Sequence, residues 1–105
     1  MFQQDGARVH TSKATIAWLD ANIKHYIPPE AWPPNSPELS PIENVWSTMA
    51  TTVYADPEPQ SLQALKQRLC KAWTSISPST LQHLIGSMPN RLKAVIKNKG
   101  NTIPY

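Results

Sequence analysis

The sequence has little of several residue types that define common classes of protein. It contains one cysteine, Cys70, which excludes an internal disulfide framework and a zinc site built from several cysteines. No apolar run approaches the roughly 18 residues that a membrane-spanning helix needs. No charged and apolar leader follows Met1, so we expect no secretory signal and predict an intracellular protein.

Charged residues are scarce and prolines are abundant. Charged residues make up 16% of the chain, where about 25% is usual, and there are 11 prolines. Residues 1–58 contain all seven acidic residues and three of the ten basic ones, whereas residues 59–105 contain the other seven basic residues and no acid. A wholly basic half suits the neutralisation of DNA phosphates, although a solvated helical surface would have the same composition.

The order of the predicted elements favours an α/β fold. We expect a short strand that ends at Asp5, a helix over residues 13–24 capped by Thr11 or Ser12, and a second short strand over His25–Ile27. Two strands do not form a stable sheet, so further strands are expected from outside these residues.

Loop and helix signals fill the rest of the chain. The proline-rich residues 28–40 predict a rigid, largely extended loop with a function of its own. Further helices are predicted over about residues 41–53, over residues 61–76, from residue 77, and from Pro89, which starts or kinks the last one before Gly100 ends it.

Two acids on different predicted elements, Asp5 and Glu43, are separated by 37 residues. Two carboxylates can converge on Mg²⁺, and such a site can cleave a phosphodiester. The residue pattern alone also fits simpler roles. Asp5 and Gly6 form a common turn pair, and Ser40 with Glu43 has the pattern of a capping box.

Three segments resemble sequence blocks of the Tc-type/mariner superfamily of DDE transposases. Residues 2–12 read FQQDGARVHTS and resemble the family block QQDxAxxHxS. Residues 32–46 read WPPNSPELSPIENVW and resemble WPxxSPDLNPIENLW. Residues 87–100 read SMPNRLKAVIKNKG and resemble SMPRRLxAVIxAKG. The blocks occur in family order, so residues 1–105 are identified as the C-terminal part of a DDE catalytic domain, with an acidic part over 1–58 and a basic helical tail over 59–105.

The resemblance implies a partial ribonuclease H-like α/β fold with three acidic ligands for Mg²⁺ or Mn²⁺. Asp5 matches the second acid and Glu43 the third. The first acid has no counterpart in these residues, so we expect little or no activity from the chain alone. The spacing of 37 residues is slightly longer than the commonest Tc-type interval, and Glu38 stands where the family usually has aspartate.

The family also implies partners and a location. The expected partners are DNA, as transposon ends and target, and a second copy or a parent transposase chain, in the nucleus. Arg91, Lys93, Lys97 and Lys99 are the candidate contacts to the DNA backbone.

Other residues are predicted to support the site or its loop. These are His10, Trp32 and Asn44. Trp32 and Trp46 flank the proline-rich loop. Aromatic rings can stack on bases in single strands, although packing into a loop or core is their commoner role.

Three functions remain open at this point. The chain is a catalytic part of a transposase whose parent cuts and rejoins DNA by metal-assisted phosphoryl transfer, or a non-catalytic module that binds DNA or another transposase chain, or a truncated relic that hardly folds.

Overall fold

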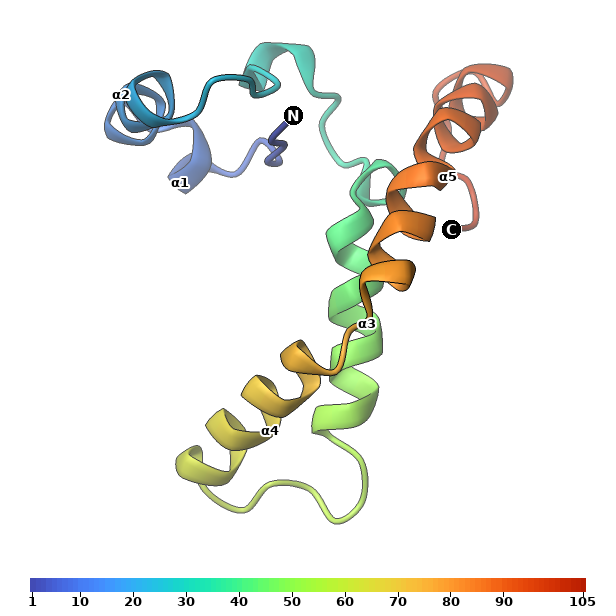
Figure 1. The fold of residues 1–105 in the computed structure, drawn as a ribbon. Helices are drawn as coiled ribbons and strands as arrows, with labels where there is room; N and C mark the ends of the chain where they lie inside the picture. Colours follow the sequence, from blue (N-terminus) through green and yellow to red (C-terminus); the bar gives the residue numbers. More distant parts are fainter. The chain divides into compact units, whose positions relative to one another are not determined.

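The structure, a computed structural model, describes residues 1–105 and is built from helices (Figure 1). The chain divides into two compact units, unit 1 over residues 1–36 and unit 2 over residues 37–105. None of the helices has both the length and the apolar character required to cross a membrane.

Unit 1 is formed by two consecutive helices and a single turn of 3₁₀ helix. Its elements are α1 (Arg8–Thr11), α2 (Lys13–Asn22) and η1 (Pro29–Ala31). The Ser12 hydroxyl accepts a hydrogen bond from the Thr15 N–H at 3.2 Å, so Ser12 is the N-cap that starts α2. Leu19 on α2 is the buried apolar residue of this unit.

The predicted strands do not form, and the α/β ribonuclease H-like prediction is wrong for this chain. Phe2 and Tyr26 make an isolated parallel bridge. Its two hydrogen bonds run from the Phe2 N–H to the His25 carbonyl at 2.9 Å and from the Ile27 N–H to the Phe2 carbonyl at 3.0 Å. A pair of this length gains too few backbone bonds to grow into a sheet, and Pro28 and Pro29 stop it because they lack the N–H of a ladder.

The proline-rich segment is also less extended than predicted. It contains η1 in unit 1 and a second 3₁₀ turn, η2 (Pro37–Leu39), in unit 2. Each turn begins at a proline, whose fixed φ is already close to the helical value.

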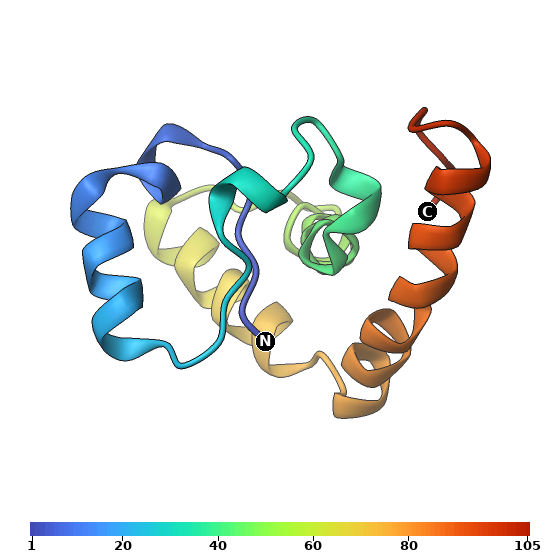
Figure 2. The same cartoon turned by 90° about the horizontal axis from the view of Figure 1, so that it is seen from above.

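Unit 2 is arranged around one central helix. After η2 it contains α3 (Pro41–Val53), α4 (Leu62–Thr74) and α5 (Pro78–Lys97). Helix α3 contacts both α4 and α5, and Figure 2, which looks nearly along α3, shows the other two on different sides of it. The apolar residues buried in this unit are Leu39, Val45, Val53 and Ala72.

The helices of unit 2 begin at the residues that the sequence predicts. The hydroxyls of Ser61 and Ser77 each accept a hydrogen bond at 3.1 Å from the N–H three residues later. Pro41 and Pro78 occupy first helical positions, where a missing N–H costs nothing.

Pro89 does not start a new helix, because α5 continues through it as one element. Pro89 and Ile85 are both exposed, so the Ile85 carbonyl that loses its partner lies on the solvent side of the helix.

Arg68 on α4 binds the end of α3. Its Nη1 donates to the carbonyls of Val53 at 3.0 Å and Ala55 at 2.9 Å, and its Nη2 donates to the Pro57 carbonyl at 2.6 Å. The last carbonyls of a helix have no partner within it and carry a partial negative charge. A half-buried guanidinium therefore holds α4 against the C-terminal end of α3.

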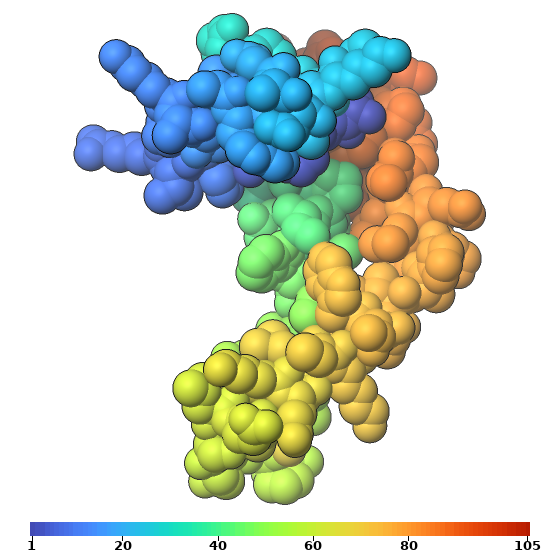
Figure 3. All heavy atoms as spheres, turned by 60° about the vertical axis from the view of Figure 1, so that its left-hand side comes forward, coloured from blue at the N-terminus to red at the C-terminus, as the bar shows by residue number.

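One face of α4 remains apolar and uncovered. Leu62 is 67% exposed, Leu69 41% and Trp73 58%, and they share one side of the helix. In Figure 3 no other element of unit 2 lies over the yellow surface of α4 on the side that faces the viewer.

Replacing Arg68 should destabilise unit 2. Arg68→Ala removes three charge-assisted hydrogen bonds, so we expect the free energy of unfolding to fall by about 1–3 kcal/mol. Arg68→Lys should recover only part of this loss, because an ammonium lacks the planar fork. Urea unfolding followed by circular dichroism measures the effect. The matched control is Lys66→Ala, an exposed cation on the same helix, which should change stability by less than about 0.5 kcal/mol. Equal stabilities of the two alanine variants would contradict this role of Arg68.

Candidate functional site

Asp5 lies in unit 1 in a tight turn between the Phe2 bridge and α1. Its Oδ1 accepts a hydrogen bond from the Ala7 N–H at 3.0 Å, which is the turn bond that the Asp5–Gly6 pair predicts. The same oxygen lies 2.6 Å from Nδ1 of His10. An ionised carboxylate only accepts hydrogen bonds, so the His10 Nδ1 carries the proton in this pair.

The environment of Asp5 keeps its carboxylate ionised. The hydrogen bond from the Ala7 N–H, followed by the one from His10, lowers the pKa of Asp5 from its ordinary value of 3.8. The side chains remain accessible, with 59% of Asp5 and 37% of His10 exposed. The structure thus presents a charged oxygen donor at the surface of unit 1.

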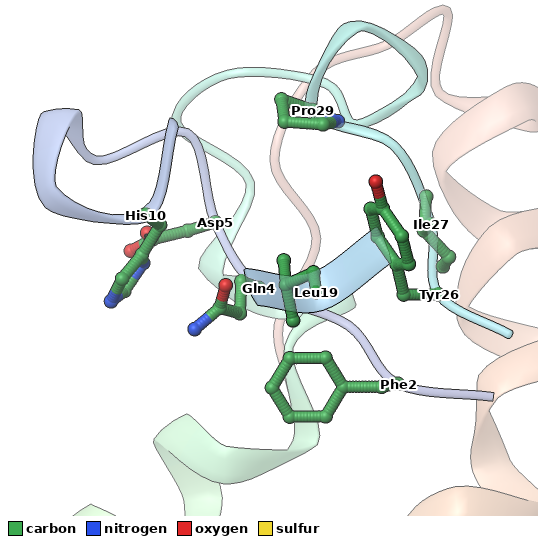
Figure 4. Close-up of a pocket in the computed structure, with 8 residues that line it drawn as sticks. All are labelled: Phe2, Gln4, Asp5, His10, Leu19, Tyr26, Ile27 and Pro29. Carbon is green, nitrogen blue, oxygen red and sulfur yellow. The ribbon is translucent and has the colours of Figure 1, made fainter. Parts of the chain in front are cut away.

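A small recess lies beside this pair (Figure 4). Its volume is about 10 Å³, about enough for one water molecule, and Phe2, Leu19 and Tyr26 form its apolar side. The Tyr26 hydroxyl donates to the Asp20 carboxylate at 2.6 Å, and this bond raises the pKa of Tyr26. The Tyr26–Asp20 pair was not predictable from the residue pattern, because Asp20 lies on α2 and Tyr26 lies outside every helix, in the isolated bridge.

Glu43 lies in unit 2, in the first turn of α3. Its side chain is exposed and its carboxylate makes no hydrogen bond or ion pair. The predicted capping box is wrong. The Ser40 side chain makes no capping bond, the Glu43 N–H donates to the Ser40 carbonyl at 3.0 Å, and the Ser40 N–H donates to the Pro37 carbonyl at 2.9 Å. The Glu43 carboxylate is therefore available to another ligand.

Asp5 and Glu43 belong to separate compact units, so each is described in its own surroundings. The structure contains no group of three or more histidine, cysteine, aspartate or glutamate side chains arranged to hold a metal ion. Convergence of the two acids on one metal stays a prediction.

The three predicted support residues have different surroundings. His10 bonds Asp5 directly. Trp32 is half-buried in unit 1. Its backbone N–H donates to the Pro29 carbonyl at 3.2 Å, at the end of η1. Asn44 is half-buried in unit 2 next to Glu43, and its Oδ1 has no hydrogen-bond partner.

Arg91, one of the candidate DNA contacts, is engaged inside unit 2. Its Nε donates to the Ser87 hydroxyl at 2.8 Å and its Nη1 donates to the Glu38 carbonyl at 3.0 Å. Its guanidinium also lies 5.8 Å from the centre of the Tyr105 ring, a cation–π distance. These contacts join α5 to η2 and to the C-terminal residue.

The three lysines of the candidate DNA surface are exposed. Lys93 and Lys97 are four residues apart on α5 and so share one face of the helix. Lys99 follows in the turn after α5, with a φ of 55°. Their contact with DNA stays a prediction.

The chain matches one family model and is similar in sequence to several known transposases. The family model described as DDE superfamily endonuclease matches residues 2–66, which include Asp5 and Glu43. The Tc3 transposable element transposase of Caenorhabditis elegans is 37% identical over 99% of this chain and 31% of its own length. The Tc1 transposase of the same species is 33% identical and the Tcb1 transposase of Caenorhabditis briggsae 35%, each over 100% of this chain and 37% of its own length. The chain thus spans about a third of the length of these curated relatives.

The Asp5–His10 bond should be measurable as a displaced titration. The pKa of Asp5 is expected below 3.8 in the wild-type chain, and His10→Ala should raise it while leaving the Ala7 contribution in place. Because the pKa is lowered on folding, the turn is stabilised above pH 3.8 and this stabilisation is lost as the pH falls through the lowered value. Carboxyl ¹³C NMR follows the titration. The control is His25→Ala, an exposed histidine of the same unit, and an Asp5 titration that is the same in both variants would refute the role of His10.

Proposed function

Because the chain belongs to the DDE superfamily endonuclease family and is a region of a Tc-type transposase, we propose that it supplies metal ligands and DNA contacts for cleavage and transfer of DNA strands by its parent enzyme. The observation that carries the proposal is the presence of two exposed carboxylates, Asp5 and Glu43, at the acidic positions of the family motifs.

The chemistry of these side chains fits Mg²⁺ or Mn²⁺. Both are oxygen donors of the kind that these hard cations prefer. Asp5 is held ionised, and the two hydrogen bonds to its carboxylate both end on Oδ1. Glu43 carries no internal hydrogen bond that a metal would have to displace. When bound, the divalent cation would polarise the phosphate and lower the pKa of the attacking water or hydroxyl.

The roles of the chain's own residues follow from these contacts. The Ala7 N–H and His10 fix the orientation of the Asp5 carboxylate, so that it meets a cation already ionised. The first turn of α3 fixes Glu43. We expect a third acidic ligand from the part of the parent that lies outside these 105 residues, and therefore little or no cleavage by the chain alone.

DNA is the proposed partner of the basic segment. Lys93, Lys97 and Lys99 are exposed and would contact phosphates, whereas Arg91 would mainly hold α5 in place. A non-catalytic module that binds DNA or a transposase chain is the second candidate, favoured by these same lysines. The nucleus is the proposed location, and a second copy of the transposase is a further proposed partner.

Removing either carboxylate from the parent transposase should abolish metal-dependent cleavage. We expect Asp5→Asn or Glu43→Gln to lower the cleavage rate at least about 100-fold, because even residues that only support metal ligands are worth about 10- to 100-fold. Gel-based cleavage of a labelled transposon end in Mg²⁺ or Mn²⁺ measures the rate. Glu58→Gln, an exposed acid of the loop after α3, is the matched control. Cleavage that survives the change of Asp5 or Glu43 would leave the binding module as the better function.

The lysines should make DNA binding strongly dependent on salt. Replacing Lys93, Lys97 and Lys99 together by alanine should weaken duplex binding and reduce the slope of log K against log salt by about 3, close to one per phosphate contact. Fluorescence anisotropy over a range of salt concentrations measures the slope. Lys13→Ala with Lys24→Ala removes exposed cations of unit 1 and should leave the slope nearly unchanged. A slope that the triple change does not alter would exclude this segment as the DNA surface.

A further inference from the structure

An open hollow lies beside Glu43 in unit 2. It is lined by one side of α3 and by the last residue of the chain, and its volume is about 510 Å³. The residues that line it are Glu43, Asn44, Trp46, Ser47, Ala50 and Tyr105.

Two exposed aromatic rings distinguish this hollow. Trp46 is 62% exposed and Tyr105 is 53% exposed, so neither ring fills the core of the unit. The packing role expected for Trp46 is therefore not what the structure shows. Large aromatic side chains left open at one concave site are typical of surfaces that bind a flat, apolar partner.

The Tyr105 ring is fixed by a chain of contacts. The Arg91 guanidinium lies 5.8 Å from its centre, and Arg91 is itself bonded to the Ser87 hydroxyl and the Glu38 carbonyl. The C-terminal residue is thereby tied to α5 and η2. The second aromatic wall of the hollow is thus anchored to the rest of the unit.

The charge of the hollow indicates which part of a ligand it accepts. Glu43 has the one charged side chain of the lining, and an unneutralised carboxylate repels phosphate. The aromatic walls suit an uncharged planar group, and every nucleobase has such a face.

We propose that this hollow receives one unpaired base of the DNA strand, stacked on the Trp46 ring with Tyr105 as a second wall. The inference rests on the proposed function, since it is Glu43 at the metal site that would bring a strand to this place. A base held here would fix the strand next to the phosphate that reacts, and paired bases of a duplex would not fit because both of their faces are already stacked.

The test compares two single-stranded oligonucleotides of equal length, one of thymidines and one of abasic sites, on the 105-residue chain. Fluorescence anisotropy gives the affinities. Trp46→Ala should weaken binding of the thymidine strand by about 5- to 100-fold, as expected for the loss of one base–aromatic stack, and should not affect the abasic strand. Trp46→Phe should retain most of the affinity. Trp73→Ala is the matched control, a tryptophan of the same unit that is 58% exposed on α4, and it should bind both strands like the wild-type chain.

Four results would overturn the base site, and they separate it from the proposed function. Equal effects of Trp46→Ala and Trp73→Ala, or an equal loss on the abasic strand, would exclude stacking while leaving phosphate binding by the lysines intact. Equal losses for Trp46→Phe and Trp46→Ala, with unchanged circular dichroism, would also exclude stacking. A wild-type chain that binds neither strand would refute the base site, whereas the DNA surface is decided by duplex binding and the role of Glu43 in metal binding by cleavage in the parent.

Discussion

The carbonyl groups at the end of α3 are held by Arg68, and the arrangement of unit 2 depends on this contact. Helix α3 is the element that both α4 and α5 contact, and its first turn presents Glu43. Arg91 plays a similar part at the other end, where it bonds the Glu38 carbonyl just before α3 begins. The helix that carries the proposed metal ligand is therefore fixed near both ends by guanidinium groups on its neighbours.

Because the arginines of residues 59–105 bind main-chain carbonyls, the basic half of the sequence has fewer cations available to DNA than its composition indicates. Its two arginines are directed at backbone carbonyls, which leaves only the lysines of this half for phosphate: Lys66, Lys71, Lys93, Lys97 and Lys99. A lysine ammonium is a flexible point charge without the planar fork with which arginine recognises guanine. The phosphate contacts proposed for these lysines would not depend on the DNA sequence. Any preference for particular bases would then have to come from elsewhere, such as the aromatic hollow beside Glu43.

Interactions between near neighbours in the chain were predictable, and distant ones were not. The capping serines Ser12 and Ser61 and the turn bond of Asp5 each join residues two or three apart, so the sequence pattern contains them. The capping box failed because the 3₁₀ turn before α3 already uses the Ser40 N–H. The predicted sheet does not form, because the Phe2–Tyr26 bridge is followed by a turn on one segment and by prolines on the other, and no third segment extends it. The Arg68 contact spans 11 to 15 residues and ends on main-chain oxygens, which leave no trace in the residue pattern.

Because Arg68 binds main-chain carbonyls and not side chains, the contact also determines which residues near it can be replaced. Every residue has a carbonyl, so an exposed position such as Ala55 can be replaced without removing the oxygen that Arg68 binds. Of the side chains in this contact, only that of Arg68 takes part in the hydrogen bonds. A replacement in the loop after α3 that keeps the path of the backbone keeps this contact, whereas a replacement of Arg68 removes it.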